Sequence, residues 1–332
     1  MFQRPQQLLS RVADLGYSLY YCNATQRPGM PPTPQGERVW IVHDFPAFID
    51  SWDFTLPTVF WASWPGHCTI LDWLRSKSVN GCLVVYDAVD YFPQWQRFEA
   101  QMIATADLII AASKPLCERL LECGKPIFLI GNGADFSLFS RAAQGILPVP
   151  REMAHISPPV IGFVGALGPW LDVDLLAALG REAERLGWTV VLVGPPFGAH
   201  VPQMKSIVSV GYKPYHELPC YIARFNVCIL PFDKSPTAAH SNPIKLYEYL
   251  ASGKPVVATD IPEALHLKDL VWVARNVEEF LSLIGEAVAN PPKNVADRLA
   301  FAMANSWETR ASQVHQAITS VWQQRWGRHI LV

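Results

Sequence analysis

The segment HSNPIKLYEYLASGKPVVAT (residues 240–259) carries the signals of a helix followed by a buried strand. Ser241 or Asn242 can cap the helix, Pro243 suits its first turn, and the glycine of SGKP suits its end. The apolar run VCILPF (227–232) lies just before it, so the helix N-terminus is expected at the carboxyl end of a parallel strand. Ligands of open α/β sheets bind at this edge.

The start of this helix combines the features of an anion site. A helix N-terminus offers free N–H groups and a partial positive charge, and Lys245 adds a full charge in the first turn. This predicts a site suited to a diphosphate. Glu248 follows three residues later on the same face, where its carboxylate can accept hydrogen bonds from a ribose diol. The alternative is that Lys245 and Glu248 form an ordinary surface ion pair.

The order of strand and helix repeats along the whole chain. The expected strands are near-continuous apolar runs, which is typical of strands covered on both faces. They lie at 17–23, 38–43, 58–63, 82–89, 108–113 and 126–133 in the first half and at 160–168, 188–194, 206–212, 227–232, 255–260 and 270–274 in the second. Strand–helix alternation predicts parallel sheets with right-handed crossovers. Because the units are too many for one open sheet, we predict an α/β protein of two Rossmann-like domains.

The predicted boundaries are 1–143 for the N-terminal domain, 144–158 for a linker, 159–305 for the second domain and 306–332 for a final helix. The chain opens with a helical pattern, whereas the first strand of a doubly wound sheet lies in its middle. The first sheet is therefore expected to be interrupted at its centre, as if an upstream strand were missing from this sequence. The alternative is a different strand order.

Composition excludes several classes of protein. Half of the 332 residues are hydrophobic, which excludes a disordered chain, and a net charge of −2 gives no support for nucleic-acid binding. The seven cysteines include no Cys-x-x-Cys pair, so a disulfide framework and a structural zinc site are both disfavoured, and a cytoplasmic location is the simplest. No apolar run reaches the length of a membrane span.

Five segments in order carry a resemblance to a known family. NPIKLYEYLASGKPVVAT (242–259) resembles the nucleotide-sugar signature of GT-B glycosyltransferases of the family 4-like group, with enzymes of teichuronic-acid or exopolysaccharide assembly as the nearest type. The other segments that match landmarks of this family are 2–23, 86–92, 108–116 and 129–139. The resemblance spans nearly the whole chain.

The resemblance implies two Rossmann-like domains facing across a cleft, with the donor nucleotide held mainly by the second domain and a final helix crossing back to the first. It implies transfer of a sugar from a nucleoside diphosphate-sugar to a hydroxyl of a glycan or lipid-linked acceptor in cell-surface polysaccharide synthesis, without a metal or other cofactor. Two alternatives are a nucleotide-sugar epimerase on the same fold and a catalytically silent partner that binds nucleotide or glycan.

Two positions depart from the family pattern. His240 stands where the family often has an acidic residue, eight positions before Glu248, which leaves the donor sugar and the stereochemical outcome open. The loop after the second domain's first strand, GALGPWLD, lacks the usual Arg and Lys. Its backbone from Gly165 to Gly168 can still approach a phosphate closely, although a tight turn alone would also explain these glycines.

Candidates for proton transfer lie in the first domain. Asp87 and Asp90 follow the strand at 82–89, where a carboxylate could take the proton from an acceptor hydroxyl. We favour Asp90 as the base and Asp87 for an orienting role, although either can instead cap a helix or hold a loop. His67 is a third candidate, although a lone loop histidine is more often solvated. The resemblance also places Tyr212 beside the nucleotide base.

The stretch FPAFIDSWDFTLPTVFWASW (45–64) is rich in aromatic residues. It can form an acceptor surface or a peripheral contact with the inner face of the cytoplasmic membrane, since Trp prefers such boundaries. The alternative is ordinary packing of core and loops.

Overall fold

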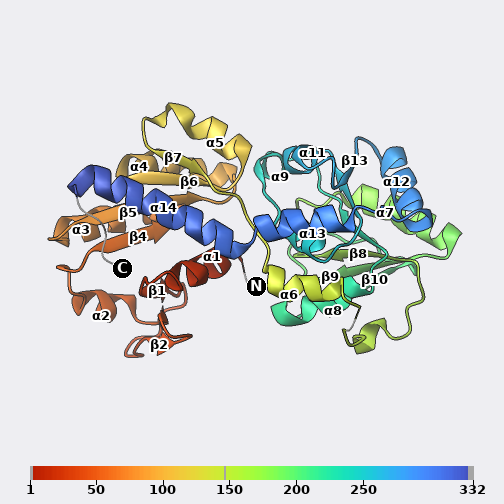
Figure 1. Cartoon of the computed structure of the whole chain (residues 1–332), viewed down its shortest axis with the longest axis horizontal. Coiled ribbons are helices and arrows are strands. Elements are labelled where there is room, and N and C mark those ends of the chain that lie inside the picture. Colours follow the sequence, from red (N-terminus) through yellow and green to blue (C-terminus); the bar gives the residue numbers. More distant parts are fainter. Residues whose placement is uncertain (1–2, 146, 328–332) are drawn as a thin grey trace. The chain divides into compact units, whose positions relative to one another are not determined.

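The computed structural model describes residues 3–145 and 147–327, and the chain folds as two compact units (Figure 1). One unit is continuous and runs from Asn132 to Ser306. The other combines the chain up to Gly131 with the chain from Trp307 onward. Residues 132–143, placed above in the first domain, thus cluster with the second unit.

The unit from Asn132 to Ser306 is built on one parallel sheet of six strands in the order β10-β9-β8-β11-β12-β13. Its strands are β8 (Val160–Val164), β9 (Thr189–Val193), β10 (Ile207–Gly211), β11 (Val227–Leu230), β12 (Val256–Thr259) and β13 (Trp272–Ala274). Counted along the chain, this order is 3-2-1-4-5-6, that of a doubly wound Rossmann sheet. The predicted fold of this domain is confirmed.

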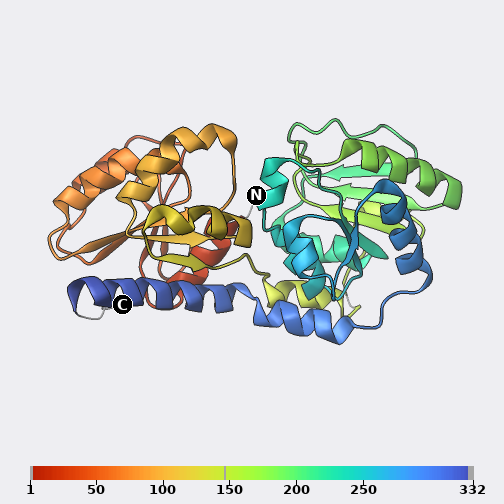
Figure 2. The ribbon, with the colours of Figure 1, turned by 90° about the horizontal axis from the view of Figure 1, so that it is seen from above.

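Helices lie on both faces of this sheet (Figure 2). They are α6 (Phe136–Phe139), α7 (Val173–Leu186), α8 (Leu218–Ala223), α9 (Pro236–His240), α10 (Ile244–Ala251), α11 (Pro262–His266), α12 (Val277–Ala289) and α13 (Val295–Ala304). Strands β8 and β11 are buried along their whole length because both faces are covered. A Cβ at Gly162 would stand 2.0 Å from the Phe225 ring, so a glycine there lets that ring pack directly on β8.

The other unit contains two separate sheets. A parallel sheet in the order β4-β5-β6-β7 is made of β4 (Thr58–Ala62), β5 (Cys82–Ala88), β6 (Leu108–Ala111) and β7 (Ile127–Leu129). A smaller sheet in the order β1-β3-β2 is made of β1 (Leu19–Cys22), β3 (Val39–Val42) and β2 (Thr33–Pro34). Within residues 3–145 and 147–327, no ladder joins the two sheets, so the predicted interruption is present.

Six helices and several 3-10 turns complete this unit. They include α1 (Arg4–Ala13), α2 (Phe45–Asp50), α3 (Cys68–Lys77), α4 (Gln96–Thr105), α5 (Lys114–Leu120) and α14 (Trp307–Trp326), with the turns η1 (Pro65–His67) and η2 (Pro93–Trp95). The described part of the chain contains no helix that is long and apolar enough to cross a membrane.

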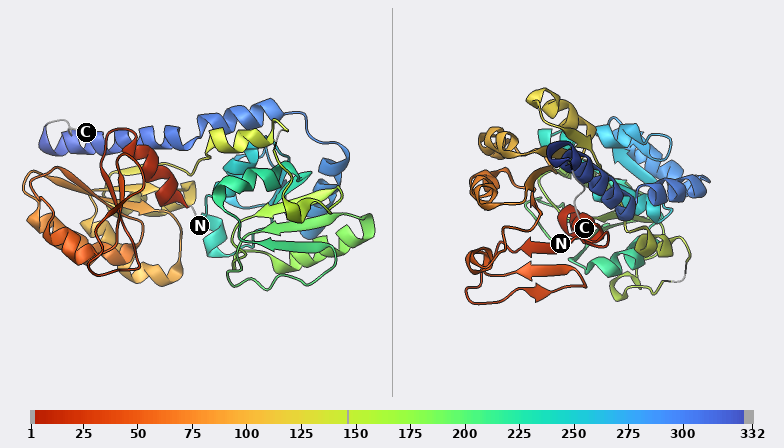
Figure 3. Two further views of the ribbon diagram at one scale, coloured as in Figure 1. Left: turned by 90° about the horizontal axis from the view of Figure 1, so that it is seen from below. Right: turned by 60° about the vertical axis from the view of Figure 1, so that its left-hand side comes forward.

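The final helix α14 packs against α1, the first helix of the chain (Figure 3). An ion pair of 2.8 Å joins Arg11 to Glu308, and the Tyr17 hydroxyl lies 3.0 Å from Nδ1 of His315. Trp322 on the same helix is buried. The predicted return of the last helix to the N-terminal half is therefore confirmed.

Candidate functional site

The topological switch point of the six-stranded sheet lies between β8 and β11, which pair directly. Because the two strands are parallel, the loop after β8 and the loop after β11 leave the sheet at the same edge. The first of these loops contains Gly165 to Gly168, and the second leads through α9 into α10. The crevice at such a point is where open α/β sheets bind their ligands.

The side chain of Lys245 lies over the glycine loop after β8. A Cβ at Gly165 would stand 2.4 Å from Cε and 3.0 Å from Nζ of Lys245, and the φ of Gly165 is +152°. The Lys245 ammonium lies 5.6 Å from the centre of the Phe163 ring and 5.2 Å from that of Phe232. The charge is thus held over aromatic faces at the switch point, and the side chain is half buried.

The start of α10 differs from the prediction. The helix begins at Ile244 with Pro243 as its N-cap and has no side-chain cap, so the expectation that Ser241 or Asn242 caps it is wrong. The Ser241 hydroxyl donates instead to the carbonyl of Ala238 at 2.8 Å. The oxygen of the Asn242 amide accepts the backbone N–H of Asn132 at 3.2 Å. Ser241 therefore makes a turn contact and Asn242 a tertiary contact, and no side chain caps the N-terminus of α10.

Glu248 lies one turn into α10 and is buried, with 5% of its surface exposed. Burial raises the pKa of its carboxyl to about 7, against the opposing effects of the Tyr215 hydroxyl and the Lys245 ammonium. The nearby Asp135 carboxylate adds to the rise. Glu248 is therefore no member of an exposed surface pair, and the alternative that treated it as one is wrong. A buried carboxyl that titrates near neutrality is typical of functional sites.

We predict that Glu248 makes the stability of the protein depend on pH. Between about pH 4.5 and about pH 7 the folded protein holds a proton that the unfolded chain has lost, so stability falls as pH rises through this window. Relative to Glu248→Gln, the free energy of unfolding of the native protein should fall by about 2–3 kcal/mol between pH 5 and pH 8. Urea titrations at several pH values measure this difference.

The exposed Glu184 on α7 provides a matched control, because Glu184→Gln removes the same charge without a buried carboxyl. A constant difference between native protein and Glu248→Gln across the whole pH range would contradict the prediction.

Gly168 and Tyr212 are the two remaining predicted donor-site residues of this unit. A Cβ at Gly168 would stand 2.5 Å from the Trp170 ring, so the loop closes against that indole. Tyr212 follows β10, the outermost strand, and 56% of its surface is exposed. His240 ends α9, where its Nδ1 lies 2.7 Å from the carbonyl of Pro236. Since a carbonyl only accepts, Nδ1 carries the proton in that contact.

Several residues of this site carry no signal in the sequence. Phe163 and Phe232 flank the ammonium of Lys245 but look like the ends of ordinary buried strands. Tyr215 and Asp135, which shift the pKa of Glu248, lie 33 and 113 positions before it in the chain. Only the tertiary fold brings these groups together.

In the other unit, Asp87 lies in β5 and is fully buried. Its carboxylate accepts two hydrogen bonds, of 3.0 and 3.2 Å, from Nε of Arg4 at the start of α1. The same guanidinium donates to the carbonyls of Ile130 and Gly131, each at 2.9 Å. Arg4 thus ties α1 to Asp87 in β5 and to the chain that follows β7. An orienting role for Asp87 in proton transfer stays a prediction.

Asp90 lies in the loop after β5, and His67 ends the η1 turn that follows β4. Asp90 is half buried, and His67 packs edge-on against the Trp64 indole with 5.0 Å between ring centres. Partial desolvation lowers the pKa of His67, which favours the neutral imidazole that a base requires. The described residues contain no group of three His, Cys, Asp or Glu arranged to hold a metal ion.

The switch-point residues fall within a segment that matches a known family. Residues 158–290 match the family described as "Glycosyl transferases group 1". This segment contains β8 with its glycine loop, β11, and α10 with Lys245 and Glu248.

Relatives and solved structures agree with this family and with the predicted GT-B fold. The chain is 26% identical over 252 residues to "Putative teichuronic acid biosynthesis glycosyltransferase TuaH" of Bacillus subtilis (strain 168), a match that covers 70% of the chain but only 58% of that relative. Anabaena Alr3699/HepE in complex with UDP and glucose is similar at a TM-score of 0.65, with 15% identity over 92% of this chain and all of that chain. Trehalose-6-phosphate synthase OtsA is similar at a TM-score of 0.72, with 10% identity over 96% and 94% of the two chains. The predicted fold class is confirmed.

Proposed function

We propose that this protein is a glycosyltransferase that moves a sugar from a nucleoside diphosphate-sugar to a hydroxyl of a glycan or lipid-linked acceptor in cell-surface polysaccharide synthesis. The observation that carries the proposal is the Lys245 side chain, which lies over the Gly165 backbone at the topological switch point of the segment that matches the group 1 family. HepE, which shares the fold, holds UDP and glucose, and the TuaH relative is named as a glycosyltransferase.

The chemistry requires stabilisation of the diphosphate as negative charge develops on it. Lys245 and the uncapped N-terminus of α10 supply positive charge that is already in place before the reaction, which is the efficient form of electrostatic catalysis. Gly165 has no side chain to keep phosphate oxygens away from this charge. These groups stabilise the diphosphate without a metal ion. Glu248 accepts hydrogen bonds from the hydroxyls of the ribose.

Two other functions fit the same fold and differ in what they release. An epimerase would convert the donor with no acceptor present, and a silent partner would bind nucleotide without turnover. The family and the named relative favour the transferase over both. With a lipid-linked acceptor, the protein acts as a peripheral protein at the inner face of the membrane.

Ligand-induced stabilisation tests the donor class. We expect one nucleotide class among UDP-, GDP-, ADP- and dTDP-sugars to raise the melting temperature, with about 2.7 kcal/mol of stabilisation at a hundredfold excess over Kd. Since HepE holds UDP, the UDP-sugars are the first to test. Failure of all four classes to stabilise the protein would contradict the proposal, and sugar conversion without an acceptor would favour the epimerase.

A further inference from the structure

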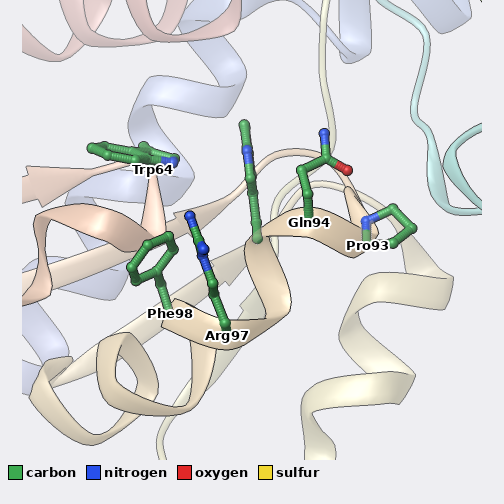
Figure 4. A pocket seen from close by; sticks show the side chains of 6 residues that line it. Trp64, Pro93, Gln94, Arg97 and Phe98 are labelled. Atoms are coloured by element: carbon green, nitrogen blue, oxygen red, sulfur yellow. The ribbon is translucent and has the colours of Figure 1, made fainter.

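A surface pocket of about 550 Å³ lies on the unit that contains β4 and β5 (Figure 4). It is formed by the loop after β4, the η2 turn and the start of α4. Its lining residues are Trp64, Pro93, Gln94, Trp95, Arg97 and Phe98. Because β4 and β5 are parallel neighbours, the pocket lies at the carboxyl edge of the sheet, the same edge as Asp90 and His67.

The aromatic walls of this pocket are held in place although they face solvent. Trp64 is 42% exposed, and its ring centre lies 6.1 Å from that of Phe98 at an angle of 66°. Trp95 packs against Phe92 with 4.5 Å between ring centres. Rings fixed in this way offer flat apolar faces at little entropic cost on binding. Pyranose rings have an apolar C–H face that suits such a surface.

The side chains of Arg97 and Gln94 form no ion pair or hydrogen bond with residues 3–145 and 147–327. Arg97 lies with its guanidinium carbon 4.5 Å from the centre of the Phe98 ring, and no carboxylate among the described residues pairs with it. Gln94 likewise makes no hydrogen bond to any described residue. The nearby Arg119 shows the contrast, because it forms a two-bond ion pair with Glu99 at 2.6 Å. Figure 4 shows the Arg97 guanidinium turned toward the Trp64 indole, whereas the Gln94 amide lies on the other side of the lining side chain between them.

A planar guanidinium with no partner, set among aromatic faces, matches an anionic group on a sugar. Guanidinium forms paired hydrogen bonds to carboxylate and phosphate, and that of Arg97 lies against the face of the Phe98 ring. An amide in the same pocket can bond to sugar hydroxyls. A neutral glycan would leave the charge of Arg97 unused, and a purely apolar ligand would leave Gln94 unpaired as well.

We propose that this pocket binds an acceptor sugar that carries an anionic group, either a carboxylate or a phosphate. The sugar packs on Trp64, its anionic group pairs with Arg97, and Gln94 bonds to a hydroxyl. That the bound sugar is the acceptor rests on the proposed transferase function, whereas the binding of an anionic sugar does not. The contact between Trp64 and His67 places the bound sugar next to one of the candidate bases.

The test is a titration of the full chain with three small sugars, followed through indole fluorescence. Methyl glucuronide supplies the carboxylate, glucose 6-phosphate supplies the phosphate, and methyl glucoside is the neutral reference. We expect at least one anionic sugar to bind on the order of tenfold to hundredfold more tightly than the neutral one, and Arg97→Gln to abolish that preference. Comparison of the two anionic sugars identifies the source of the charge.

Lys77→Gln is the matched control, because Lys77 lies over the exposed Trp73 ring at 5.9 Å and makes a similar cation–aromatic pair elsewhere in the unit. It should leave the preference intact. Equal binding of charged and neutral sugars, or an unchanged preference in Arg97→Gln, would overturn the inference. If a nucleotide sugar still stabilises the protein in that case, the proposed function stands and the pocket alone fails. If the anionic sugar bound but no nucleotide sugar did, the pocket would stand and the proposed function would fail.

Discussion

Replacement of Lys245 by Ala should lower kcat/KM for sugar transfer by on the order of 100- to 1,000-fold. The reason is that, in the proposed function, its ammonium over the Gly165 backbone stabilises the charge that develops on the departing diphosphate. Loss of one such preorganised donor costs about 2–4 kcal/mol of transition-state stabilisation in other enzymes. Steady-state kinetics with the true donor measures this loss, and calorimetry with the free nucleoside diphosphate separates ground-state binding from it.

Lys234→Ala is the control for this prediction. Lys234 lies in the connection between β11 and α9, but its side chain is 73% exposed and pairs with Asp260 at 3.1 Å. Removal of that charge should leave turnover within about twofold, since exposed ion pairs contribute little. If Lys245→Ala kept native turnover, the donor site assigned here would be wrong.

The sequence predicts the placement of Lys245 and Glu248 near the topological switch point because the informative signals are local. The buried strands before and after it are continuous apolar runs, and a lysine in the first turn of a helix that follows such a strand lies at the ligand-binding edge by topology. The cap was predicted wrongly because Asn242 is used elsewhere: its amide holds Asn132, which is 110 positions away. Local propensity identifies the residue types that can cap a helix, not the tertiary contacts that compete for them.

The charged pair of the other unit shows the same limit more sharply. Asp87 follows an apolar run in the way that a catalytic carboxylate does, and nothing near it in the sequence indicates an ion pair. Its partner, Arg4, is 83 positions away and lies in helix α1. Both side chains of this pair are buried, and this follows only from the packing of α1 against the strands in the folded protein.

Replacement of Arg4 by Ala should destabilise the protein by about 3–5 kcal/mol, because it leaves the Asp87 carboxylate buried without its partner. The carbonyls of Ile130 and Gly131 would lose their donors as well. Burial raises the pKa of Asp87 even with the Arg4 guanidinium present, so the desolvation cost outweighs the attraction within the pair. Removal of both charges in Arg4→Met with Asp87→Leu should therefore cost far less than either single change.

Denaturant unfolding of these variants measures the effect, and Arg11→Ala is the control on the same helix. Arg11 pairs with Glu308 at the surface, so its loss should cost about 1 kcal/mol or less. The comparison also separates structure from chemistry at Asp87. A structural carboxylate predicts that Asp87→Ala loses stability and activity together, and that the charge-free double variant recovers much of both. If the double variant folded stably but transferred no sugar while still binding nucleotide, Asp87 would take part in the reaction itself, and the ion pair with Arg4 would serve to position it.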